Sequence, residues 1–237
     1  MPKAKALTVG IVLYDGFDSL DVLGPFQTFT FAGMTRFLVA ETLAPVTSFE
    51  GVSIKPHTTF DTCPKLDILM VPGGATPVDV LLKGHPGSNP VLDFLIARAP
   101  DAHLVCSVCT GALLLAGAGL LNGYDATTHW AYKDVLRLFP VKVVNDYRRY
   151  IKSDNRITSA GISAGLDVSM YIVSLVLGLD VARQCQLAMQ YNPQPPFHCG
   201  DPDDSEIRDN PGMVEERKKA WDVADAAKQV AEWICQG

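Results

Sequence analysis

Cys109 stands in the surroundings that point most directly to chemistry. An apolar segment at residues 104–108 leads straight into the apolar run at residues 112–115, with Cys109 at the junction. Ser107 and Gly111 flank it at two residues on either side, the spacing of small residues in a sharp strand-to-helix turn that carries a nucleophile. A helix N-terminus favours thiolate over thiol. The sequence therefore predicts a nucleophile, against the alternative of a small core side chain.

Cys106 and Cys109 also form a C-x-x-C pair, a pattern found in redox and zinc sites. Cys106 falls inside the predicted strand, whereas redox pairs place both cysteines at the start of a helix. A second C-x-x-C and a His-x-x-x-His pattern are absent from the sequence. We interpret the pair as coincidental, and we expect no bound metal.

Apolar runs and breaker residues predict alternating strands and helices. Strands are expected at residues 7–14, 36–41, 67–71 and 124–128, in the segment that ends before Cys109, and in a hairpin of residues 141–153 and 156–159. Helices are expected from Asp18 or Ser19, directly after Cys109, and at residues 90–98, 131–138, 163–177, 180–190 and 212–235. Residues 45–60 are expected to be irregular or a hairpin. This alternation favours an α/β fold with a parallel sheet and helices on both faces.

A second candidate loop follows the strand at residues 67–71. That strand ends in Pro72-Gly73-Gly74, where the missing Cβ atoms allow a ligand to approach the backbone closely. Ligands of open parallel sheets bind beyond the carboxyl ends of the strands. Gly73, Gly74 and Cys109 are therefore expected to share one crevice.

Composition narrows the classes of partner. The chain has 237 residues, 48% of them hydrophobic, and a formal net charge of −6. This length suits a single domain, predicted to span residues 1–237. The acidic balance favours a small-molecule partner over nucleic acid or an anionic membrane. The start of the chain does not match a signal peptide, and no segment is apolar enough to span a bilayer. Six cysteines then suggest free thiols and a cytoplasmic location.

Five ordered blocks resemble the ThiJ/PfpI superfamily, which shares a flavodoxin-like sheet and a nucleophile-elbow cysteine with class I glutamine amidotransferase domains. The resemblance spans about residues 7 to 199. The blocks are Leu20-Asp21-Val22-Leu23-Gly24-Pro25, Val71-Pro72-Gly73-Gly74, Ser107-Val108-Cys109-Thr110-Gly111, Ala126-Thr127-Thr128-His129-Trp130 and Gly161-Ile162-Ser163-Ala164-Gly165-Leu166-Asp167. The implied fold is a flavodoxin-like α/β domain.

Within the superfamily, the chain is most similar to the isocyanide hydratase subgroup, on the aspartate of the first block, the threonine after the cysteine and the late segment 191–197. This resemblance implies addition of water to an isocyanide, giving an N-substituted formamide through a cysteine thioimidate. It implies Cys109 as nucleophile and Asp21 as proton donor. Thr110 and the Gly74 N–H would hydrogen-bond the sulfur or an intermediate. No metal or organic cofactor is needed, and a homodimer is expected.

Other branches of the superfamily fit less well. PfpI-type peptidases and several chaperone or glyoxalase members carry histidine where this chain has Thr110. The Parkinson-disease-associated branch carries glutamate at the position of Asp21. AraC-type regulators need a C-terminal helix-turn-helix module, whereas we expect one clear helix after Gln190. The remaining alternatives are a glyoxalase or deglycase acting on reactive carbonyls, and a non-enzymatic stress sensor in which Cys109 is oxidised.

Several residues keep two interpretations. Asp21 is either the acid or a helix cap. His129 is either catalytic or structural. Ile162 and Trp130 either wall the pocket or belong to the core. Cys185 is expected in the core, and His198-Cys199 is expected to be a loop pair.

Residues 192–237 are expected to form a C-terminal loop and helix extension. The predicted terminal helix has an apolar stripe opposite its charged residues, formed by Val214, Ala220 or Trp221, Ala224, Val230 and Trp233. The stripe is expected to pack either on its own domain or on a second subunit.

Overall fold

A mostly parallel seven-stranded sheet forms the centre of the protein, which the computed structural model describes over residues 7–237. The residues before Leu7, which bear on the signal-peptide prediction, lie outside that range. The strand order is β10-β11-β7-β6-β1-β2-β5, and only β10 and β11 pair antiparallel. Its strands are β1 (Thr8–Val12), β2 (Thr35–Ala40), β5 (Thr58–Thr59), β6 (Ile68–Val71), β7 (Leu104–Ser107), β10 (Tyr150–Ser153) and β11 (Arg156–Ser159). Two small sheets contain β3 (Val46–Thr47) with β4 (Ser53–Ile54) and β8 (Asp125–Ala126) with β9 (Lys142–Val143).

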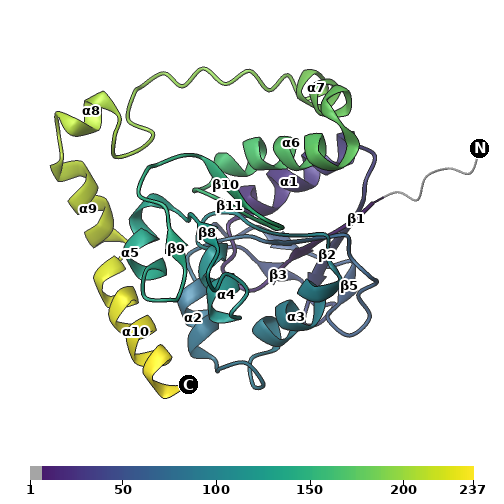
Figure 1. The fold of residues 1–237 in the computed structure, drawn as a ribbon, viewed down its shortest axis with the longest axis horizontal. Coiled ribbons are helices and arrows are strands. Elements are labelled where there is room, and N and C mark those ends of the chain that lie inside the picture. The colour runs from purple at the N-terminus through teal and green to yellow at the C-terminus, as the bar shows by residue number, and fades with distance from the viewer. Residues whose placement is uncertain (1–6) are drawn as a thin grey trace, which may run out of the picture.

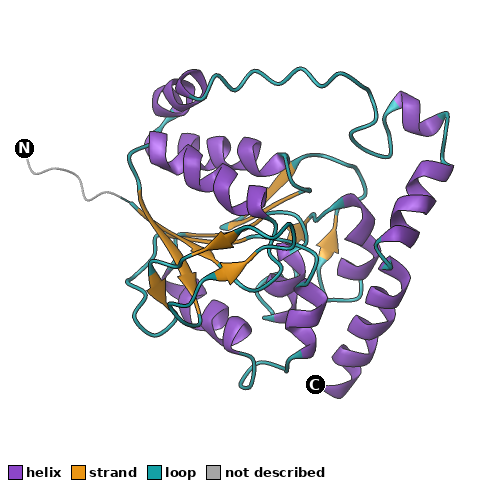
Figure 2. Cartoon of the chain, turned by 180° about the vertical axis from the view of Figure 1, so that it is seen from behind, coloured by secondary structure: helices purple, strands orange, loops and turns teal. Residues whose placement is uncertain are grey.

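Helices cover both faces of this sheet, as the alternation predicted. Figure 1 shows α1 and α6 on one face and α2, α3 and α4 on the other, and Figure 2 shows the same layers from behind. The helices up to residue 188 are α1 (Ser19–Phe31), α2 (Pro77–Leu82), α3 (Pro90–Arg98), α4 (Gly111–Gly117), α5 (Lys133–Leu136), α6 (Ala164–Leu177) and α7 (Leu179–Ala188), with 3-10 turns η1 (Ala99–Asp101) and η2 (Trp130–Tyr132). The α/β prediction is confirmed, although α2 and the pairing of β5 with β2 were not anticipated.

Adjacent strands bring the two candidate loops together. β6 and β7 pair in parallel with Val71 opposite Ser107, so both strands end at the same level of the sheet. The loop after β6 contains Gly73 and Gly74, and the loop after β7 contains Cys109. The register of this single strand pair therefore creates the predicted crevice.

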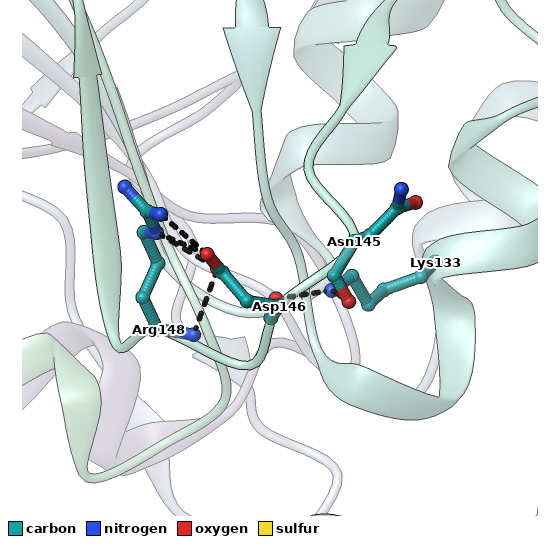
Figure 3. A network of polar contacts seen from close by, with 4 residues as sticks. All are labelled: Lys133, Asn145, Asp146 and Arg148. Atoms are coloured by element: carbon teal, nitrogen blue, oxygen red, sulfur yellow. Dashed lines mark hydrogen bonds and ion pairs between the residues drawn. The ribbon is translucent and has the colours of Figure 1, made fainter.

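Residues 141–153 do not form one hairpin arm, and this prediction was wrong. Only β9 and β10 are extended, and the segment between them is a loop held by side chains. The buried Lys133 amine donates to the carbonyl of Asn145, at 3.0 Å, and to that of Asp146, while Arg148 pairs with the Asp146 carboxylate (Figure 3). These contacts satisfy backbone groups that a strand would have paired.

The predicted terminal helix is two helices, and its apolar stripe differs from the predicted one. After α7, the chain contains α8 (Ser205–Arg208), α9 (Gly212–Ala220) and α10 (Val223–Gln236), so the prediction of one helix was wrong. Asp222 has φ 49° and ψ 41°, and this left-handed conformation ends the regular helix. The buried stripe of α10 consists of Val223, Val230 and Trp233, whereas Ala224 is exposed.

This stripe packs on the chain's own domain. α10 contacts α2 and α5, and the Trp233 ring stacks on His85 with centroids 4.4 Å apart. Because α10 is anchored there, the turn before it is held beside the carboxyl ends of the strands. Among the helices described, none is long and apolar enough to cross a membrane.

Candidate active site

Cys109 occupies the strained turn that the sequence predicted. Its φ is 55°, a left-handed conformation that is costly for a residue with a Cβ. The neighbouring chain fixes this conformation, because the Cys109 N–H donates to the Ala160 carbonyl at 3.2 Å and the Cys109 carbonyl accepts from the Thr128 hydroxyl at 2.8 Å. The thiol is therefore presented at one defined position between β7 and α4.

Glycine is required where the two loops meet. A Cβ on Gly73 would lie 2.5 Å from the Thr110 nitrogen and 2.8 Å from the Cys109 Cβ. A Cβ on Gly111 would lie 2.3 Å from the Val71 carbonyl oxygen. The close approach predicted for Gly73 is thus made by the protein's own nucleophile loop.

Asp21 is completely buried behind this turn, in the first helix. Its Oδ2 accepts the Gly73 N–H at 2.9 Å, and its Oδ1 has no hydrogen-bond partner within the described part of the chain. Burial raises the pKa of Asp21 well above its ordinary value, the charge of Asp18 adds to the rise, and the Gly73 hydrogen bond opposes it. Burial therefore favours the protonated, uncharged form of this carboxyl. Asp18, not Asp21, caps α1.

The pKa of the Cys109 thiol is shifted in the direction opposite to the sequence expectation, which was a thiolate favoured by the helix N-terminus. Burial and the nearby Asp21 charge raise its pKa well above the ordinary value, and hydrogen bonding from Thr110 only partly offsets this rise. The helix end that was expected to favour thiolate is outweighed, because desolvation penalises the charged form. Burial thus favours the uncharged forms of both the Cys109 thiol and the Asp21 carboxyl.

Thr110 and Gly74 are bonded to each other. The Gly74 N–H donates to the Thr110 hydroxyl oxygen, and that hydroxyl donates to the Gly74 carbonyl, each at 3.0 Å. The Gly74 N–H is therefore not free to face the sulfur, which was the expected role. The Thr110 hydroxyl also lies within hydrogen-bonding reach of Cys109, so its proton can move toward the sulfur when charge develops there.

A cavity of about 380 Å³ opens over the thiol. It brings together five of the eight predicted site residues: Gly74, Cys109, Thr110, His129 and Ile162. Asp21 and Gly73 are not among its lining residues; Asp21 is fully buried and accepts the Gly73 N–H next to the Cys109 turn. Trp130 does not line it either, because its ring packs against Trp221 with centroids 5.8 Å apart.

His129 is a neutral residue of the cavity wall. Its Nδ1 accepts the Ala131 N–H at 3.3 Å, which leaves the proton of the neutral ring on Nε2. Burial lowers the pKa of His129 to about 4. The ring can donate a hydrogen bond into the cavity, and it is poorly suited to act as a base at neutral pH.

Seven of the twelve residues that line the cavity were not predicted as site residues from the sequence, Ala75 among them. Phe49, Tyr132 and the turn between α9 and α10, residues Ala220, Trp221 and Asp222, all line it. Asp18, which the sequence offered only as the start of a helix, also lines it. The available signal was weak: the apolar spacing of the terminal helix breaks at Trp221-Asp222.

The other chemical groups singled out in the sequence lie apart from the cavity. Cys106 is buried in β7, where desolvation raises the pKa of its thiol, and it forms no disulfide. Cys185 is buried, as predicted, and Cys199 lies in an exposed loop. Among residues 7–237, no group of three or more His, Cys, Asp or Glu side chains could hold a metal ion.

Comparison with known proteins identifies relatives of this arrangement. The DJ-1/PfpI family matches residues 7–175. The isonitrile hydratase of Pseudomonas putida is 41% identical over 199 residues, which cover 84% of this chain and 84% of that protein. The transcriptional regulator GbdR of Pseudomonas aeruginosa is 29% identical over 56% of this chain, but over only 35% of its own length. A solved structure of a ThiJ/PfpI family protein from Pseudomonas syringae, at 33% identity, superposes with a TM-score of 0.85 over 98% of this chain and 92% of that one.

Proposed function

The chain belongs to the DJ-1/PfpI family, and on that premise we propose that it is an isocyanide hydratase with Cys109 as its nucleophile. The proposal is supported by the 41% identical isonitrile hydratase of Pseudomonas putida, which matches along most of both chains. The family resemblance predicted from the sequence is confirmed. The proposed activity rests on this resemblance together with the chemistry of the site residues.

One observation carries the mechanism: a buried carboxylic acid with a free oxygen stands beside the thiol. Isocyanide hydration needs a proton at the terminal carbon and a nucleophile at the same carbon. Burial raises the pKa of Asp21 and so favours its protonated form, and its Oδ1 has no hydrogen-bond partner among the described residues. In this proposal Asp21 supplies the proton and Cys109 the nucleophile. A solvated carboxylate would have no proton to give at neutral pH.

In the first step, the sulfur of Cys109 bonds to the terminal carbon of R–N≡C. Asp21 gives its proton to that carbon and takes up the thiol proton, so that the acid is regenerated. The product is a thioimidate, R–N=CH–S–Cys109. The Thr110 hydroxyl and backbone N–H stabilise the charge that develops on the sulfur during attack.

In the second step, water adds across the C=N bond, with hydroxyl going to carbon and the proton to nitrogen. The tetrahedral adduct collapses, the C–S bond breaks, and the hydroxyl proton passes to the departing sulfur. The products are R–NH–CHO and the Cys109 thiol. The neutral His129 Nε2–H is available to hold the adduct's oxygen, and no redox change occurs in either step.

The decisive assay measures loss of cyclohexyl isocyanide and appearance of its N-formamide, with Cys109→Ala as the control. Formamide formed by the wild type alone is the expected result. Consumption of methylglyoxal without formamide would move the function to the carbonyl enzymes of the family. If neither substrate reacts, the oxidation-sensor alternative becomes the better account.

We also propose a homodimer in the cytoplasm. Exposed Leu20 and Leu23 on α1 and Leu175 and Leu177 on α6 provide apolar surface that a second copy would cover. The six free cysteines suit a reducing compartment. Light scattering and cell fractionation test these two statements. The single-domain organisation of residues 1–237 is likewise a proposal, testable by limited proteolysis.

A further inference from the structure

The turn between α9 and α10 forms part of the cavity wall although it lies far outside the matched family region. Ala220, Trp221 and Asp222 line the cavity, whereas the family match ends at residue 175. This turn is fixed on both sides. α10 is anchored by its buried stripe, and the Trp221 ring meets His129 edge-on at 5.1 Å.

The turn contains one residue, Asp222, in a strained left-handed backbone conformation. Asp222 is left-handed, a conformation that aspartate and asparagine tolerate better than most residues. No side-chain hydrogen bond from Asp222 caps α10. Its carboxylate is therefore not used to start the helix, and its charge is felt at Tyr132, whose phenol also senses Cys109.

The charged side chains that line the cavity all belong to acidic residues. Its titratable lining groups are Asp18, Cys109, His129, Tyr132 and Asp222, and none of the described lining residues is lysine or arginine. His129 is neutral, because its pKa is about 4, and burial raises the pKa values of Asp18, Cys109 and Tyr132. Asp222 is an exposed acidic residue. The charged side chains among its described lining residues are therefore acidic, and none of them has a lining cation beside it.

We propose that the α9–α10 turn selects the substrate's substituent, with Asp222 rejecting anionic groups and Trp221 offering an apolar ring to uncharged or cationic ones. This inference rests on the proposed function for its substrate class: isocyanides without a carboxylate or other negative charge. A negative substituent would be drawn out of water into a cavity that offers it no cation. An ammonium or an apolar group would instead meet aromatic faces at Phe49, Tyr132 and Trp221.

The first test compares two isocyanides of similar shape, isocyanoacetate and its uncharged methyl ester. The wild type is expected to favour the ester in kcat/KM. Asp222→Asn, which suits the same backbone conformation, is expected to reduce that preference about fivefold. Asp225→Asn removes an equal charge from α10 at a residue that does not line the cavity, and it is expected to leave the ratio unchanged.

A second test does not depend on hydratase activity. Cys109 is alkylated with iodoacetate or with iodoacetamide, and the labelled peptides are counted by mass spectrometry, with exposed Cys199 as internal reference. Asp222→Asn is expected to raise the iodoacetate-to-iodoacetamide ratio at Cys109 alone. An unchanged ratio, or an equal change in Asp225→Asn, would overturn the selection by Asp222. If no isocyanide is hydrated, the proposed function fails, and this ratio still decides the inference.

Discussion

Replacing Asp21 by asparagine tests the proposed proton-donor role of Asp21 through both hydratase activity and the stability of the fold. Asparagine has nearly the same shape, its carbonyl can still accept the Gly73 N–H, and its amide fills the place of the unpartnered Oδ1. It has no proton to deliver. Loss of a positioned general acid typically lowers the rate about 10² to 10⁴-fold, so kcat/KM for cyclohexyl isocyanide should fall by that amount.

The same substitution should change how stability depends on pH. The pKa of Asp21 is raised in the folded protein, so above its ordinary value of 3.8 the unfolded chain loses a proton that the folded chain keeps. Wild-type stability therefore falls as pH rises through the window between the ordinary and the raised pKa. Over that window, the contribution of Asp21 changes by about 1.4 kcal/mol per pH unit. In Asp21→Asn this contribution is absent, because the amide does not titrate.

Urea unfolding of Asp21→Asn and wild type at a series of pH values from 4 to 8 measures this difference. The stability difference should move in favour of Asp21→Asn as the pH rises. Asp79→Asn, an exposed residue in the first turn of α2, is the matched control and should show no comparable trend. A flat difference for Asp21→Asn, or retention of near-normal hydratase turnover, would refute the assignment of Asp21 as a buried, protonated donor.

Three further outcomes are expected. Cys109→Ala should remove formamide formation, by at least about 10³-fold, while circular dichroism shows an unchanged fold; residual turnover near wild type would exclude the nucleophile. Gly73→Ala should lower both the melting temperature and kcat/KM, because its Cβ would meet Thr110 at 2.5 Å; Gly33→Ala, with open space around it, should lower stability only through its positive φ, and unfolding curves compare the two. His129→Asn should leave the pH profile of kcat/KM between pH 5 and 8 without a new limb, because the pKa of His129 is already about 4; disappearance of a limb would identify it as a catalytic base.

Local sequence patterns were sufficient to predict several elements of this fold. Breaker residues and apolar runs predicted α1, α3, α6 and most strands of the sheet, because these elements bury continuous apolar segments. The small residues around Cys109 predicted its strained turn, which the φ of 55° confirms. Gly74 and Cys109 could be placed in one crevice, since parallel strands end at the same edge of a sheet.

The pKa values and the outer wall of the site depend on how distant parts of the chain pack together. The raised pKa values of Asp21 and Cys109 arise first from burial and then from nearby carboxylates, Asp18 for Asp21 and Asp21 for Cys109, which no local pattern encodes. The cavity wall at Trp221 and Asp222 comes from a segment more than a hundred residues beyond the nucleophile. Its placement depends on how α10 packs against α2 and α5, and long-range packing of this kind is set by the assembled surfaces of several elements together.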